Sequence, residues 1–271
     1  MRSQTKHLVT VLSLALFAAS SAPAQLITIT DTTPGASTRD GTLNPGEYGG
    51  LTYYSSGIGS GFGNVLGSNS QIFFDASLGG ALNVGFQLGA NLNDAGVIYI
   101  DSIGGGLTGT TTIEDTGDSG RSAISGDGGG NESELTFAAG FTADYAITLE
   151  NNFSGLFRIE NDGSLTFVTS LNLTPTGDAS QQQREGELLL SDIGVSLGGS
   201  FNYVATYLNS GNAFRSDELH GHSTALGGNI GQNPFTFDNY NTFITPVPEP
   251  TSVALLGLGA ASLLIFSRRK A

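Results

Sequence analysis

Short runs that alternate between apolar and polar residues constrain the fold of this chain more than any other feature. Between residues 81 and 88, every second residue is apolar, beginning at Leu82. A period of two is that of a β-strand with one buried face. The run 200–209 has aromatic residues on one face and aliphatic residues on the other, so we expect this strand to be covered on both sides.

The remaining sequence favours many short strands joined by turns. Glycine is the commonest residue, at 40 of 271, and Asn161-Asp162-Gly163-Ser164 is typical of a tight hairpin. The sequence predicts an all-β domain, an antiparallel β-sandwich or jelly roll. We expect loops at 55–70, 104–134, 174–184 and 214–234. The segment 181–187 comes nearest to a helix, and 191–194 is expected to form one turn. Further strands are predicted at 26–30, 51–54, 71–75, 97–101, 135–137, 145–150, 156–160, 165–171, 187–190, 235–237 and 242–244.

The first 24 residues have the three-part order of a secretory signal peptide. Arg2 and Lys6 form a basic start, residues 8–19 are almost all apolar, and Ala22-Pro23-Ala24 is a small-x-small cleavage pattern. Cleavage by signal peptidase after Ala24 would leave Gln25 as the mature N-terminus. The sequence therefore predicts a signal helix over 1–24 and a mature β-sandwich ectodomain over 25–246.

The C-terminal end has a second apolar segment, 253–266, followed by Arg268, Arg269 and Lys270. The charge-free stretch 251–266 would span about 24 Å as a helix, against about 30 Å for the hydrocarbon core of a bilayer. We expect a single short transmembrane helix, which adapts by local thinning of the bilayer. The basic cluster is expected on the cytoplasmic side, with the preceding chain outside the cytoplasm.

The same end resembles a known sorting signal. Pro248-Glu249-Pro250, an apolar helix and the terminal Arg268-Arg269-Lys270 are similar in order and position to the PEP-CTERM tail of exported bacterial proteins. The resemblance assigns 247–271 to this tail and implies processing by an exosortase, a membrane-embedded protease. It also implies transient anchoring in the inner membrane, release to the cell surface or outside, and an association with exopolysaccharide.

Composition excludes several functions for the predicted ectodomain. Residues 25–246 contain five arginines, no lysine and 23 acidic residues, a formal charge of −18. Such a surface repels nucleic acid and anionic lipid. The chain has no cysteine, so it has no disulfide, no thiol nucleophile and no thiolate metal site.

A second resemblance extends through the ectodomain. Asp40-Gly41-Thr42-Leu43 with Glu47-Tyr48 resembles the opening of carbohydrate-binding sandwiches of the family 9 and DOMON-like type, and later strands follow in a similar order. The resemblance implies binding of sugar or haem, although this chain lacks the tryptophans on which sugars stack. Tyr48, Tyr53 and Tyr54 are candidates for stacking on sugar rings, although core or edge packing is the role that we favour for them.

The loop 104–134 is rich in glycine and acidic residues. Flexible oxygen donors suit Ca²⁺, and the candidate ligands are Asp115, Asp118, Asp127 and Asn131. Their spacing matches no known calcium motif, so a solvated acidic loop is the alternative. We expect no other cofactor.

Two further patterns are compatible with catalysis or metal binding. His220 and His222 would face the same side of an extended chain, with Asp217 or Glu218 as a third metal ligand; exposed loop residues are the alternative. Asp75 and Asp101 end apolar strands and are the best-placed acids for glycoside hydrolysis, although we favour a loop-anchoring or turn role for them. The glycine-rich run 57–61 lacks the strand-to-helix context of a nucleophile elbow or a phosphate cradle.

These observations leave two hypotheses of different classes. The first is a surface or matrix protein without catalytic activity, structural or bound to glycan. The second is a surface glycoside hydrolase or metal-dependent hydrolase with a site borne on loops. The absence of cysteine, the scarcity of histidine and the lack of a nucleophile motif favour the first.

The export signals generate a direct test. We expect mass spectrometry of surface material to find an N-terminus near Gln25, because the cleavage pattern ends at Ala24. Replacement of Pro248-Glu249-Pro250 by alanines is expected to leave the protein in the inner membrane. An intact Met1 on surface protein, or unchanged release of the variant, would contradict these assignments.

Overall fold

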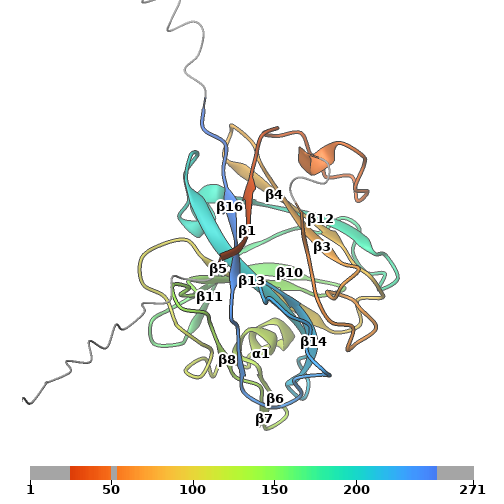
Figure 1. Ribbon diagram of the computed structural model, residues 1–271, viewed down its shortest axis with the longest axis vertical. Helices are drawn as coiled ribbons and strands as arrows, with labels where there is room; N and C mark the ends of the chain where they lie inside the picture. Colours follow the sequence, from red (N-terminus) through yellow and green to blue (C-terminus); the bar gives the residue numbers. More distant parts are fainter. Residues whose placement is uncertain (1–24, 50–53, 249–271) are drawn as a thin grey trace, which may run out of the picture.

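The computed structural model describes residues 25–49 and 54–248, and these form a β-sandwich of one large and one small sheet (Figure 1). The predicted signal peptide and membrane helix lie outside the described residues. Within the described residues, no helix is long and apolar enough to cross a membrane. The all-β prediction is confirmed.

The large sheet has eight strands in the order β1-β16-β13-β5-β9-β10-β11, with β14 also paired to β13. Neighbouring strands are antiparallel, except that β1 and β16 run parallel. Their bounds are β1 (Gln25–Thr30), β5 (Ala95–Asp101), β9 (Tyr145–Leu149), β10 (Ser154–Ile159), β11 (Leu165–Ser170), β13 (Ser200–Asn209), β14 (Phe214–His220) and β16 (Tyr240–Ile244).

The small sheet is antiparallel, in the order β12-β4-β3-β2. Its strands are β2 (Tyr54–Ser56), β3 (Gln71–Ala76), β4 (Ala81–Gln87) and β12 (Gln183–Leu189). Two short ladders complete the β-structure, a parallel pair of β8 (Leu135–Thr136) with β15 (Phe235–Thr236) and a hairpin of β6 (Asp127–Gly128) with β7 (Asn131–Glu132). The described helical elements include α1 (Ser119–Ser125), a 3-10 turn over Leu190–Ile193 and 3-10 structure at residues 47–49.

The large sheet is buried on both faces. One face packs on the small sheet, where Phe74 of β3 contacts the rings of Phe201 and Tyr203 of β13. The other face packs under α1 and the segments around β8 and β15, with Val204 and Leu208 among its buried residues. The expectation that the strand 200–209 is covered on both sides is therefore confirmed.

Four local predictions were wrong, and each error involves buried polar residues or short elements. Residues 214–220 were expected in a loop and form β14, a buried strand whose charged side chains have internal partners. The strand β12 begins at Gln183, inside the expected loop 174–184. The loop 104–134 contains α1, β6 and β7, and the sheet is not purely antiparallel because β1 pairs with β16.

The first and last strands of the described domain, β1 and β16, lie side by side at one edge of the large sheet. β1 begins at Gln25, and its residue Thr30 is opposite Ile244 at the end of β16. After β16 the chain stays attached as far as Pro246, whose carbonyl accepts a hydrogen bond from the Gly198 N–H. Val247 is then 72 % exposed. The sorting tail therefore leaves the sandwich at this edge.

A long segment, residues 31–49, lies across the outer face of the small sheet, and we call it the strap. The side chains of Leu43 and Tyr48 lie over Gly85 of β4, where a Cβ atom would be only 2.9 Å from either of them. The ring of Tyr48 also packs against Phe73, with 5.4 Å between ring centroids. Glycine at position 85 is therefore required for the strap to approach the sheet this closely.

Candidate functional site

Buried carboxylates hold the long loops by accepting backbone hydrogen bonds. Asp75 of β3 is fully buried, and it accepts from the N–H groups of Gly35 and Ser37 at 2.8 Å each. Glu185 of β12 accepts from the N–H groups of Asp40 and Gly41. These two acids fix the strap to the small sheet. Burial raises the pKa of Glu185, while its hydrogen bonds oppose that shift.

The most extensive set of these hydrogen bonds joins β14 to the glycine-rich loop that follows β2. Glu218 accepts from the N–H groups of Phe62, Asn64 and Leu66 at 2.7 to 2.8 Å. Its neighbour Asp217 accepts from Ser60 and Gly61. The run of N–H groups resembles a cradle for an anion, and the chain's own carboxylates occupy it.

The two histidines do not form a metal pair. His220 is fully buried, and its Nε2 lies 3.0 Å from Ser70 Oγ. His222 Nδ1 lies 2.7 Å from Asp238 Oδ1. Gly221 between them has φ +83°, so the chain is not extended and the expected shared face is lost. Within the described residues, no group of three or more His, Asp or Glu could hold a metal ion.

The candidate acids for glycoside hydrolysis lie on different sheets. Asp75 belongs to the small sheet and anchors the strap, so the anchoring alternative describes it. Asp101 ends β5 in the large sheet and accepts from Asn202 Nδ2 at 3.0 Å. Burial raises the pKa of Asp101, and the nearby carboxylate of Asp144 adds to the shift. Asp144 itself holds the N–H groups of Ser102 and Ile103.

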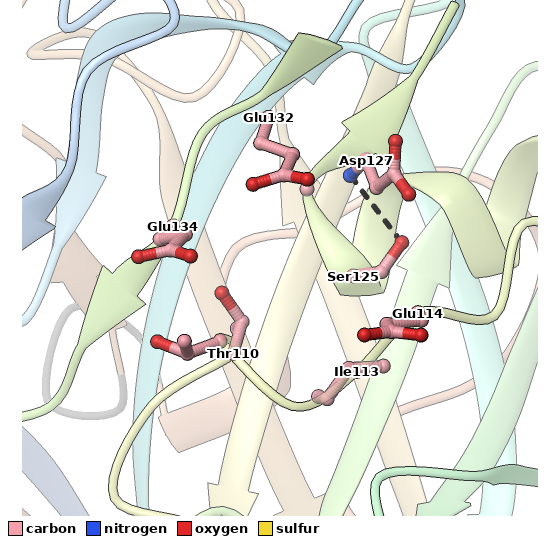
Figure 2. A pocket seen from close by; sticks show the side chains of 9 residues that line it. Thr110, Ile113, Glu114, Ser125, Asp127, Glu132 and Glu134 are labelled. Carbon is pink, nitrogen blue, oxygen red and sulfur yellow. Dashed lines mark hydrogen bonds between the residues drawn. The ribbon is translucent and has the colours of Figure 1, made fainter. Parts of the chain in front are cut away.

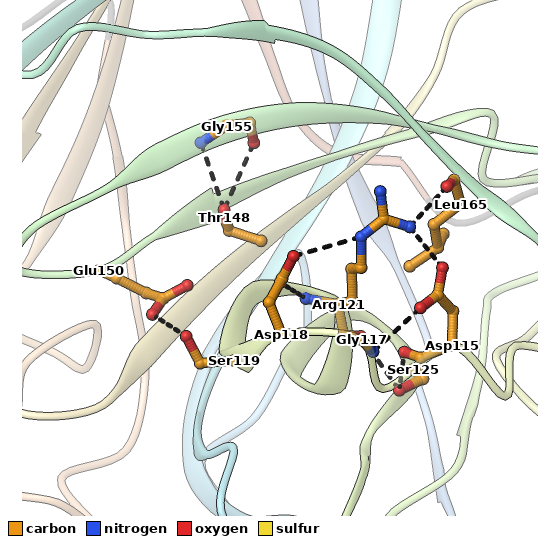
Figure 3. A network of polar contacts seen from close by, with 10 residues as sticks. All are labelled: Asp115, Gly117, Asp118, Ser119, Arg121, Ser125, Thr148, Glu150, Gly155 and Leu165. Carbon is orange, nitrogen blue, oxygen red and sulfur yellow. Dashed lines mark hydrogen bonds and ion pairs between the residues drawn. The ribbon is translucent and has the colours of Figure 1, made fainter.

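Among the described residues, the expected calcium ligands do not form a group of three or more acids that could hold a metal ion. Asp115 and Asp118 both form ion pairs with Arg121, and Asp118 also caps α1 by accepting from the Arg121 N–H (Figure 3). Asp127 and Asn131 lie on the separate β6–β7 hairpin. The single guanidinium of Arg121 offsets one of the two negative charges of this pair and occupies carboxylate oxygens that a calcium ion would need.

Residues of the same region instead line an acidic pocket of about 510 Å³. Glu114, Asp127, Glu132 and Glu134 surround it, with Thr110 and Ser125 between them (Figure 2). The hydroxyl of Ser125 accepts a hydrogen bond from the Asp127 N–H at 3.3 Å. The pocket concentrates negative charge.

A second pocket, of about 370 Å³, lies where the strap meets the end of the small sheet. Its polar lining includes the amide side chains of Gln71, Gln87 and Gln183, which are neighbours across β3, β4 and β12. Its apolar lining includes Leu43 and Phe73. We call it the amide pocket. Sequence reasoning missed these glutamines, because only strand pairing places them in one row.

The three candidate tyrosines lie in different parts of the chain's structure or outside the described residues. Tyr48 lines the amide pocket but is only 1 % exposed, and its hydroxyl donates to Glu185 at 3.0 Å. The packing role describes Tyr48, because its ring packs against the small sheet and is not free to stack on a sugar. Tyr54 begins β2, where it pairs with Phe73. Tyr53 lies outside the described residues.

Comparison with known proteins identifies the tail alone. Residues 246–270 match the family model of the PEP-CTERM protein-sorting motif. The chain therefore carries the sorting signal of exported proteins that exosortases process, as its C-terminal sequence predicted. No curated protein matches the chain. The match begins at Pro246, whose carbonyl accepts a hydrogen bond from the Gly198 N–H of the folded domain.

The anchoring role of Glu218 can be tested by an isosteric change. Glu218→Gln places an NH₂ group against N–H donors, so a buried donor loses its acceptor. We expect the free energy of unfolding, measured with denaturant, to fall by about 3 kcal/mol. The control Glu187→Gln, at a half-buried position of β12, is expected to change it by less than about 0.5 kcal/mol. Equal effects would contradict the anchoring role.

Burial of His220 predicts a stability that depends on pH. Burial lowers the pKa of His220 from 6.5 to about 3. Between pH 6.5 and about pH 3, His220 is protonated in the unfolded chain but not in the folded protein. The free energy of unfolding therefore decreases as the pH is lowered through this window. The neutral, buried His220 is expected to lower the free energy of unfolding by about 2 kcal/mol at pH 5 relative to pH 7. We expect the His220→Gln variant to lack this decrease when the free energy of unfolding is measured by denaturant titration at several pH values. The same dependence on pH in the variant and the native protein would contradict the assignment.

Proposed function

We propose that the mature protein is a non-catalytic component of the cell surface or extracellular matrix that associates with exopolysaccharide. The sorting motif at 246–270 supports the export route and the final location outside the cytoplasm. The association with polysaccharide rests on the folded domain.

The proposal that the protein is non-catalytic depends on one observation: candidate acid and base side chains are buried and hold loops in place. Asp75, Glu218 and His220 are fully buried and hydrogen-bonded within the protein. A general acid or base must reach the substrate proton to act. These side chains hold loops in place, and a substrate has no access to them.

Charge supports a role in a hydrated matrix. Of the five ectodomain arginines, Arg184 and Arg215 are fully buried, and Arg121 is paired with two aspartates. Six acidic residues are buried as well, so three arginines and 17 acidic residues remain outside the buried set, and the exterior stays strongly negative. A highly charged surface keeps a protein soluble and separate from other anions.

The acidic pocket favours one alternative, a surface glycoside hydrolase. Its carboxylates are those that such chemistry uses in pairs. A cosedimentation experiment with the producer's own exopolysaccharide separates the two functions. We expect the exported protein to bind the polymer and to leave its size distribution and reducing ends unchanged. Release of new reducing ends would favour the hydrolase, and failure to bind would contradict the proposal.

A further inference from the structure

Three carboxamide side chains lie in one row along the amide pocket. Gln183 is directly opposite Gln87, and Gln87 is directly opposite Gln71, across three adjacent strands. Gln183 Nε2 donates to Gln87 Oε1 at 3.0 Å, and Gln87 Nε2 donates to the Leu88 carbonyl. All three side chains are half-buried. The row is therefore pre-ordered at the edge of the pocket.

One carboxamide in the row is available to a ligand. The side chain of Gln71 has no hydrogen-bond partner among the described residues, and it lines the pocket. A carboxamide has two N–H donors and an acceptor oxygen. The hydrogen bond between Gln183 and Gln87 fixes the orientation of these two neighbouring amide groups. The pocket thus presents donors and acceptors side by side.

The strap supplies the apolar side of the pocket. Leu43 and the exposed Pro45 border it, and Phe73 lies at its base beside Tyr48. The strap is fixed there because the Leu43 N–H donates to Gln183 Oε1 at 3.2 Å. An apolar wall opposite a few fixed polar groups is the usual design of a small-molecule site, and about 370 Å³ is within the usual size range.

The chemistry of the lining selects among ligands. A sugar ring has an apolar C–H face and an edge of hydroxyl groups that both donate and accept, and carboxamides can do the same. Glu47 is the only acid among the lining residues, and its oxygens already accept from Thr38 and the Asn44 N–H. The formal charge of −18 disfavours an anionic ligand at any part of this surface.

We propose that the amide pocket binds a neutral sugar unit of a polysaccharide, with Gln71, Gln87 and Gln183 contacting its hydroxyl groups and the strap covering its apolar face. This proposal rests on the proposed association with polysaccharide and names the site and the ligand class. It assigns no role in binding to the acidic pocket.

The test uses the full chain and calorimetric titration with defined oligosaccharides. The neutral probes are maltohexaose, cellohexaose, mannohexaose and oligosaccharides from the producer's own polymer, and trigalacturonic acid is the anionic probe. We expect at least one neutral probe to bind and the anionic probe to fail. Gln71→Ala is expected to weaken binding by about tenfold through loss of hydrogen bonds. Gln182→Ala is the matched control, because Gln182 is exposed and lies outside the pocket.

Several outcomes would overturn the proposal. Binding of no neutral probe, or preference for trigalacturonic acid, would refute the ligand class. Unchanged affinity in Gln71→Ala, with an unchanged melting temperature that shows the fold is intact, would refute the site. If Gln71→Ala still cosediments with exopolysaccharide as the native protein does, the site is wrong and the proposed function stands. If the native protein does not cosediment, both fail.

Discussion

Hydrogen bonds from loop backbone to buried carboxylates are the interaction on which the rest of this structure depends. The chain has no disulfide to close its long loops. Asp75 and Glu185 hold the strap, Asp144 holds the chain after β5, and Glu218 with Asp217 holds the glycine-rich loop after β2. A hydrogen bond to a charged group contributes about 1.5–3 kcal/mol, roughly twice a neutral one. Several such bonds on one carboxylate offset the cost of burying its charge.

This use of carboxylates connects the fold to the proposed function. An acidic protein has many carboxylates from which an active site can be built, but here the buried ones are occupied by N–H groups. The strap illustrates the consequence, because anchoring by Glu185 and Asp75 places Leu43 above the glutamine row. The amide pocket is therefore a product of the same interaction that stabilises the loops.

The pairing of the first and last strands connects the fold to export. β16 lies between β1 and β13, so the strand that leads into the sorting tail is held on both sides. The residues of β1 immediately follow the predicted cleavage point. The tail motif begins where the backbone hydrogen bonds of the domain end.

The sequence by itself determined the strand-rich fold, most strand positions and the sorting motif, because alternation of apolar residues and linear motifs are local properties. It did not reveal β14, where Arg215, Asp217 and Glu218 are buried in a strand that looks polar. Burial of a charge is decided by its partners, and these lie far away in the sequence. For the same reason, only the tertiary structure moved Asp115 and Asp118 from calcium ligands to partners of Arg121. The glutamine row likewise exists only through the register of β3, β4 and β12, which brings together residues that are separate along the chain.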